Sequence, residues 1–214
     1  MLRLTDLRLP FDHDESSLEQ AIREQLGLPD DAPLNWQIRR RSVDARKKNA
    51  IMFNYTVDLE TTGEAALPNR IKNTSGPMLK LSQSPDETYA MPPRAPEGPF
   101  KRPVVIGAGP CGLFAGLLLA QAGWRPILLE RGRPARDRAR DVMRFWHRGE
   151  FDPISNVSFG EGGAGTFSDG KLTTQIKDRE HRCRKVLTEL VAAGAPEEIL
   201  WAAKPHVGTD ILIR

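Results

Sequence analysis

The glycine-rich segment GAGPCG at residues 107–112 constrains the fold of this chain more than any other feature of the sequence. It follows the apolar run Val104–Ile106 and precedes an uncharged, mostly apolar stretch. A second apolar run, Ile127–Leu129, comes next and is followed by the acidic Glu130. This order is typical of a β-α-β unit with parallel strands. We therefore predict that both apolar runs are buried strands and that residues 110–122 form a helix between them.

Each glycine of the G-x-G-x-x-G pattern has a physical role in binding a dinucleotide. Gly107 permits the tight turn, and Gly109 lets a diphosphate approach the backbone because it has no Cβ. Gly112 lets the helix pack closely on the strand. The helix that begins near Pro110 directs unpaired N–H groups and the positive end of its dipole toward the phosphates. The alternative interpretation is a glycine-rich turn that binds no ligand.

The acid after the second strand fits the same type of site. The Glu130 carboxylate can accept hydrogen bonds from both ribose hydroxyls of an adenosine, and it would repel a 2′-phosphate. Arg131 and Arg133 lie nearby in the sequence and weaken the argument against a 2′-phosphate. We interpret Cys111 as a small apolar residue that packs beneath the phosphate loop, with a redox thiol as the alternative.

Residues 1–91 predict a small α+β domain. Alternation of apolar and polar residues over 2–9 indicates a strand, and Leu18, Ile22 and Leu26 share one face of a helix. We expect strands at 2–9, 35–42, 50–59 and 87–91, a helix that begins near Ser16 and ends before Gly27, and a second helix at 64–72. The two middle strands form a hairpin. This order fits a ferredoxin-like domain.

The rest of the chain is expected to be an extended, proline-rich linker at 92–103 and a second domain at 104–214. In that domain we predict helices at 135–147 and 179–193, separated by a long Gly- and Ser-rich loop. The predicted inward side chains are Val142, Met143 and Trp146 in the first helix and Val186, Leu187, Leu190 and Val191 in the second. Gly208-Thr209-Asp210 is a helix N-cap signal.

The charge balance does not require a nucleic-acid or membrane partner. The chain has 31 basic and 28 acidic residues, a net charge of +3. Six basic residues crowd the segment 39–48, which could bind RNA. The aromatic pair that stacks bases is not evident, with Phe53 and Tyr55 the nearest approach. A solvated hairpin, or a docking surface for the second domain, is therefore favoured over nucleic-acid binding.

Cysteine, histidine and hydropathy patterns indicate a cytoplasmic protein without a metal site or a membrane segment. Cys111 and Cys183 lie far apart and form no C-x-x-C pair, which favours a reducing compartment. The four histidines have no ligand spacing, although His147 and His206 could lie near an active site. The uncharged segment 103–124 is long enough to cross a bilayer, but its glycines favour a strand, turn and helix. No secretory signal is visible at the N-terminus.

Two longer runs resemble known flavoproteins. The run VVIGAGPCGLFAGLLLAQAGWRPILLERG resembles the FAD-binding fingerprint of the glutathione reductase-like flavoproteins. The run SNVSFGEGGAGTFSDGKLTT, at residues 155–174, is similar to the signature of a bacterial family of FAD-dependent dehydrogenases. The runs RRRSVDARKK and KPHVGTDIL are also similar to that family. The fold class that this implies is α/β, with an incomplete FAD/NAD(P)-binding Rossmann-like start after the ferredoxin-like domain.

The resemblance implies which residues bind the cofactor. The first glycine turn would lie along the pyrophosphate, and Glu130 would hold the adenosine ribose. A second glycine-rich loop, residues 155–174, would pass the pyrophosphate and the flavin. Lys171 would offset phosphate charge or lie near the flavin N1 region. The implied FAD-binding residues are Gly107, Gly109, Pro110, Cys111, Gly112, Glu130, Arg131, Gly132, Gly162, Gly163, Ala164, Gly165, Thr166, Ser168 and Lys171. The alternative interpretation of the second loop is a flexible Gly/Ser surface loop.

The function expected from these features is the FAD-binding part of a flavin-dependent oxidoreductase that acts on an unidentified small molecule, with NAD(P)H as a candidate electron donor. No catalytic acid or base can be named. Members of the resembling family run well beyond this length, so we expect a truncated product or a fragment, with the missing C-terminal half as a candidate partner. The alternatives are a fragment of an NAD-binding dehydrogenase, and a nucleic-acid-binding module fused to a non-catalytic flavoprotein remnant.

Overall fold

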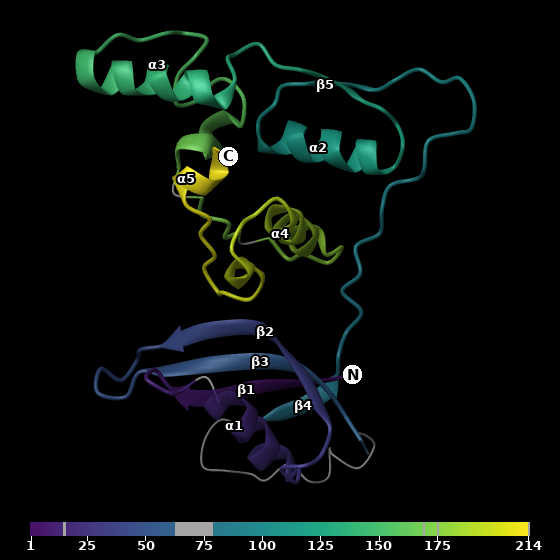
Figure 1. Cartoon of the computed structure of the whole chain (residues 1–214), viewed down its shortest axis with the longest axis vertical. Coiled ribbons are helices and arrows are strands. Elements are labelled where there is room, and N and C mark those ends of the chain that lie inside the picture. Colours follow the sequence, from purple (N-terminus) through teal and green to yellow (C-terminus); the bar gives the residue numbers. More distant parts are fainter. Residues whose placement is uncertain (15, 63–78, 169, 175, 214) are drawn as a thin grey trace. The chain divides into compact units, whose positions relative to one another are not determined.

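A computed structural model describes residues 1–14, 16–62, 79–168, 170–174 and 176–213 (Figure 1). The chain divides into two compact units. The first unit comprises Met1–Glu87 and Glu197–Pro205, and the second comprises Thr88–Pro196 and His206–Arg214. The first unit thus combines the N-terminal strands with residues 197–205, and the second includes the proline-rich segment 92–103.

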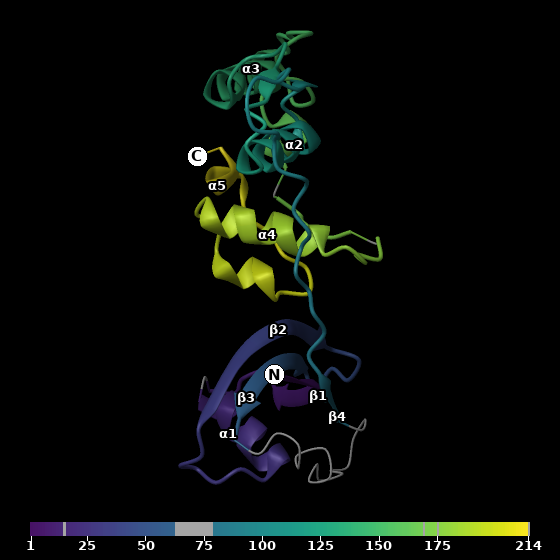
Figure 2. The ribbon, with the colours of Figure 1, turned by 90° about the vertical axis from the view of Figure 1, so that its right-hand side faces the viewer.

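The first unit is an antiparallel sheet with one helix, α1 (Ser16–Leu26), packed against it (Figures 1 and 2). Its strands are β1 (Leu2–Pro10), β2 (Leu34–Asp44), β3 (Met52–Thr61) and β4 (Lys80–Gln83), in the order β2-β3-β1-β4. Strands β1 and β2 are each antiparallel to β3, which lies between them. They are therefore parallel to each other, and β1-α1-β2 forms a split β-α-β unit.

The core of this unit is formed as the apolar pattern predicts. Three of the four leucines of β1 pack with the predicted face of α1 and with alternate residues of β3. The buried residues are Leu2, Leu4, Leu7, Leu18, Ile22, Leu26, Tyr55, Val57 and Leu59. Helix α1 ends at Gly27, whose φ of +62° is a left-handed conformation that glycine adopts without strain.

The predicted closing strand at 87–91 is wrong. The fourth strand is β4, and residues 87–91 have no regular structure. Leu81 in β4 packs against the core, whereas Met91 is exposed, so the earlier segment gains more from pairing with β1. Glu87 instead accepts a hydrogen bond from Arg3 Nη1 at 2.6 Å. The helix expected at 64–72 lies outside the described residues, and the ferredoxin-like domain stays a prediction.

Segment 197–205 adds to the open edge of β2. It contains the 3-10 helix η3 (Glu197–Leu200) and forms a parallel bridge between Ala202 and Arg41. The Arg41 N–H donates to Trp201 O at 2.7 Å, and the Ala203 N–H donates to Arg41 O at 3.0 Å. The Arg41 guanidinium lies over the Trp201 ring at 4.4 Å and over the Phe53 ring at 4.7 Å. Two stretches far apart in the sequence therefore build the first unit.

The second unit contains the predicted β-α-β arrangement. Strands β5 (Val104–Ile106) and β6 (Ile127–Leu129) pair in parallel, and α2 (Pro110–Gln121) connects them. The remaining elements are α3 (Ala135–Arg148), the 3-10 helix η2 (Gly163–Phe167), α4 (Arg182–Ala192) and α5 (Thr209–Leu212). These elements confirm the mixed α/β class that the sequence predicts.

The predicted burial of this unit is wrong in two places, the parallel strands and helix α3. Both strands are largely exposed, with Ile106 at 86%, because within the described residues only two strands form the sheet. On α3, Val142 is buried, but Met143 and Trp146 are exposed. The face of α3 that turns inward carries Arg138 and Asp141 instead. Helix α4 begins three residues later than expected, and none of its side chains is fully buried.

None of the helices in the described part of the chain is long and apolar enough to cross a membrane.

Candidate nucleotide-binding site

The turn at 107–112 has the geometry that its glycines predict. Gly107 has a φ of +97°, and its N–H donates to Leu129 O at 2.7 Å, which joins the ends of the two strands. A Cβ at Gly112 would lie 1.9 Å from Gly107 O, so the helix can approach the turn this closely only with glycine at that position. A Cβ at Gly109 would meet nothing within 4 Å. The turn is closed toward the strand and open at Gly109.

Helix α2 begins beside this open space. Pro110 is its first residue, no side chain caps it, and its first turn contains no acidic residue. The first N–H groups of a helix have no partner within the helix, so they are donors for an anion. Cys111 is exposed, and the interpretation that it packs beneath the turn is therefore wrong. At the second position of the helix its side chain extends outward.

Glu130 connects the two turns that follow the parallel strands. Its Oε2 accepts the Ala108 N–H at 2.6 Å, and its Oε1 accepts the Gly132 N–H at 2.7 Å. These bonds from Ala108 and Gly132 lower the pKa of the Glu130 carboxyl below its ordinary value of 4.5. A Cβ at Gly132 would lie 2.4 Å from Gly160 Cα, so the second turn also touches the second glycine-rich loop.

The second glycine-rich loop lies against the first turn. The Gly162 N–H donates to Ala108 O at 2.7 Å. A Cβ at Gly163 would lie 3.2 Å from Gly109 Cα, and one at Gly165 would lie 3.3 Å from Pro110 Cγ. The structure thus brings together residues that the sequence separates widely. The N–H groups of Gly162 and Gly163 donate to Ala108 O and Gly160 O, so both are engaged within the protein.

The other predicted site residues of this loop lie deeper or further along. Ala164 and Thr166 belong to η2, and Thr166 is 5% exposed, with its hydroxyl donating to Glu161 O at 3.1 Å. The Ser168 hydroxyl donates to Gly165 O at 2.9 Å. Lys171 forms a backbone bridge with His206. The Arg131 guanidinium lies over the Phe159 ring at 5.5 Å.

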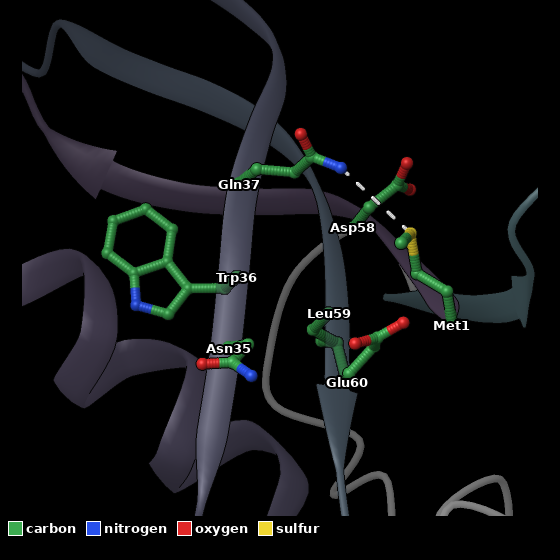
Figure 3. Close-up of a pocket in the computed structure, with 7 residues that line it drawn as sticks. All are labelled: Met1, Asn35, Trp36, Gln37, Asp58, Leu59 and Glu60. Atoms are coloured by element: carbon green, nitrogen blue, oxygen red, sulfur yellow. Dashed lines mark hydrogen bonds between the residues drawn. The ribbon is translucent and has the colours of Figure 1, made fainter.

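Each unit has a cavity that could take a small ligand. One of about 330 Å³ borders the glycine loop, at the lower end of the range for ligand pockets. It is lined by Leu113, Pro134, Ala135, Arg136, Glu161, Gly162, Thr166, Leu212 and Ile213. The other, of about 220 Å³, lies on the sheet of the first unit (Figure 3). There the Gln37 amide points toward the Met1 sulfur at 3.9 Å, and the Asp58 carboxylate is already held by Arg3.

Half of the basic run at 39–48 is paired with acidic side chains of its own unit. Arg39 pairs with Asp58 and Glu87, Arg41 pairs with Glu198, and Arg46 pairs with Asp44. Phe53 stacks against Phe11 and Arg41, and Tyr55 is buried. The two candidate stacking rings are therefore covered. Among the described residues, no group of three or more His, Cys, Asp or Glu could hold a metal ion.

Two family models match parts of the chain. A domain of unknown function matches residues 1–60, and an FAD binding domain matches residues 102–143. The second match covers β5, α2, β6 and most of α3, and it supports FAD binding by this part of the chain. An uncharacterized protein of Clostridium beijerinckii is 43% identical over 217 residues, which cover 99% of this chain and 38% of that protein. The chain thus spans well under half the length of this relative.

One buried residue of this region has no recognisable signal in the sequence. Arg138, in α3, is 0% exposed and donates hydrogen bonds to several carbonyl groups of the second glycine-rich loop. A basic residue in a helix rich in arginine and aspartate is typical of a solvated surface. No pattern in the sequence identified it as buried.

Proposed function

We propose that this chain is the FAD-binding part of a flavin-dependent dehydrogenase with a Rossmann-like, glutathione reductase-like cofactor fold. The observation that carries the proposal is the contrast between two glycines. Gly112 is pressed against Gly107 O, whereas the position of a Cβ at Gly109 is empty. The turn is therefore tight where the helix meets the strand and open where a diphosphate would approach.

The residues around this opening suit the cofactor. Gly107, Gly109, Pro110 and Gly112 would contact the diphosphate, and the start of α2 offers N–H donors to its charge. Glu130 stays ionised and is exposed. Its carboxylate can therefore give up a hydrogen bond from a backbone N–H and accept hydrogen bonds from the ribose hydroxyls instead. When bound, FAD supplies a two-electron carrier that accepts hydride. The chain itself binds and orients this group.

The alternative with the same turn is an NAD-binding dehydrogenase. The second glycine-rich loop favours FAD, because it packs on Gly109 and Pro110 and an NAD domain does not need it. NAD(P)H is then proposed as the electron donor to the flavin rather than as the resident nucleotide. For the whole protein, we further propose a small-molecule substrate and a cytoplasmic location.

A direct test is to identify the nucleotide that the purified chain retains. We expect a flavin absorbance spectrum and FAD after acid extraction and chromatography, or FAD uptake on reconstitution. Gly109→Val fills the open space and should abolish that uptake, whereas Gly116→Ala, inside the helix α2 that follows and with nothing near its Cβ, should not. FAD uptake by Gly109→Val equal to that of the unmodified chain would refute the diphosphate assignment.

The rival nucleic-acid role can be measured separately. Three of the four arginines of the basic run, Arg39, Arg41 and Arg46, are paired with carboxylates, which disfavours phosphate contacts. We expect negligible filter retention of single-stranded RNA at physiological salt. Tight retention with a steep salt dependence would favour the rival.

A further inference from the structure

Arg138 is a buried charge with an unusual set of partners. Its side chain is completely covered, and such a group needs hydrogen bonds to offset the loss of water. Its acceptors are Asn156 O at 2.9 Å, Val157 O at 3.0 Å, Gly163 O at 2.9 Å, Thr166 Oγ1 at 3.2 Å and Glu161 O. No carboxylate of the described residues forms an ion pair with it. The guanidinium is therefore held by carbonyl and hydroxyl oxygens rather than by a direct ion pair, and the carboxylates of Glu130 and Glu161 act on it from a greater distance.

The second glycine-rich loop is shaped around this side chain. Gly160 has a φ of +118°, and a Cβ there would lie 2.2 Å from Arg138 Cδ. The Phe167 ring covers the guanidinium at 4.9 Å. Burial lowers the pKa of Arg138, while the negative charges of Glu130 and Glu161 oppose that shift. Arginine keeps its proton even when buried, so the charge persists.

The loop that Arg138 holds is the one that touches the diphosphate turn. Arg138 Nη2 binds Gly163 O, and Gly163 lies against Gly109. The neighbouring Gly162 N–H donates to Ala108 O. The Glu161 carboxylate accepts the Ala135 N–H at 2.7 Å, which ties the loop to the start of α3 as well. One residue therefore separates the guanidinium from the open side of the turn.

We infer that Arg138 is a positioning residue for the diphosphate of the bound dinucleotide. It turns the carbonyl groups of 156–163 inward, which keeps Gly162 and Gly163 against Gly109 and fixes the width of the opening. Its guanidinium lies behind Gly163, on the loop that borders the open side of the turn, and its positive charge favours a negatively charged diphosphate over a neutral ligand. This inference rests on the proposed FAD-binding function, and Arg138 acts through Gly163.

The test compares ligands with and without the diphosphate. FAD, ADP and adenosine are titrated by calorimetry into the full chain and into Arg138→Met, Arg138→Lys and Arg140→Met. Arg140 is the matched control, because it lies on the same helix with its side chain 79% exposed. Circular dichroism shows whether each variant folds. A purely structural role would weaken ADP and adenosine alike.

We expect Arg138→Met to weaken FAD and ADP by about 10- to 100-fold, the value of a charged hydrogen bond, while adenosine changes by less than about 3-fold. Arg138→Lys keeps the charge, but a lysine ammonium cannot donate to several carbonyl groups as the planar guanidinium does. This variant should lower the affinity for ADP by about 3- to 10-fold. Arg140→Met should bind as the unmodified chain does.

The outcomes distinguish a failure of the proposed FAD-binding function from a failure of the positioning role of Arg138. If the unmodified chain binds neither FAD nor ADP, the proposed function fails and this inference fails with it. If the unmodified chain binds both and Arg138→Met loses ADP and adenosine equally, only the positioning role is overturned. Should Arg138→Met not fold, Arg138→Lys decides the matter, and an unchanged ratio of ADP to adenosine affinity overturns the inference.

Discussion

Of the two glycines inside α2, Gly112 is the one where a single methyl group would have a large effect. A Cβ there would lie 1.9 Å from Gly107 O and 3.0 Å from the Gly107 carbonyl carbon. Both atoms are backbone, and the Gly107 N–H is fixed by its bond to Leu129 O. Neither the helix nor the turn can therefore relieve the overlap alone. Gly116, one turn later, has nothing within 4 Å of its Cβ position.

These distances give opposite signs for the two alanine substitutions. An overlap of this size with backbone atoms costs about 3 kcal/mol, at the upper end of overpacking effects. The better helix propensity of alanine offsets this by about 0.8 kcal/mol. Gly112→Ala should therefore lose about 2 kcal/mol, and Gly116→Ala should gain up to about 0.8 kcal/mol. The two variants should differ by about 3 kcal/mol, roughly 100-fold in the opening equilibrium.

Amide hydrogen exchange followed by mass spectrometry is the appropriate assay. The chain has two compact units, so one global unfolding transition does not isolate α2, whereas exchange of peptides from 107–122 does. Exchange there should accelerate in Gly112→Ala and slow in Gly116→Ala. Protection in Gly112→Ala equal to that of the unmodified chain would refute the close contact between helix and turn.

Three further predictions concern charged side chains. Arg3→Met removes the partner at 2.7 Å from buried Asp58 and should lower the unfolding free energy by about 2 kcal/mol in urea titrations, against no change for exposed Arg46→Met; equal midpoints would contradict it. The pKa of Glu130 is depressed in the folded chain, so its contribution is present above pH 4.5 and lost as pH falls through the folded pKa. Glu130→Gln should flatten the acid loss of protection at 107–112, and an unaltered pH profile would count against this. Arg41→Ala should expose segment 197–205 to limited proteolysis, by losing stacking and an ion pair worth about 1–2 kcal/mol, whereas Arg40→Ala should not; resistance in both variants would show that Arg41 does not hold this segment on β2.

The sequence predicted what depends on local pattern. The apolar runs and glycines fixed the order of β5, α2 and β6, and the spacing of Leu18, Ile22 and Leu26 gave the buried face of α1. Gly112 was assigned its role from spacing alone, and the contact with Gly107 O agrees with it. These features are set by residues close together in the chain.

The features that could not be predicted from the sequence depend on contacts between residues far apart in the chain. The inward face of α3 was assigned to Met143 and Trp146, because apolar side chains are usually buried. It is instead set by Arg138, whose carbonyl partners come from a loop that no periodicity describes. The docking of Trp201 on β2 likewise depends on Arg41. Nothing in the sequence distinguishes Arg41 from the other basic residues of the run 39–48.

The pairing of 201–203 with β2 has a consequence for the order in which the protein is made. The N-terminal sheet leaves the ribosome long before Trp201 has been synthesised. Until then Arg41 lacks the indole and the Glu198 carboxylate that enclose it in the finished molecule. A shortened gene that stops within the proline-rich linker would produce the sheet without segment 197–205. The backbone N–H and C=O of Arg41 would then stay unpaired at the outer edge of β2.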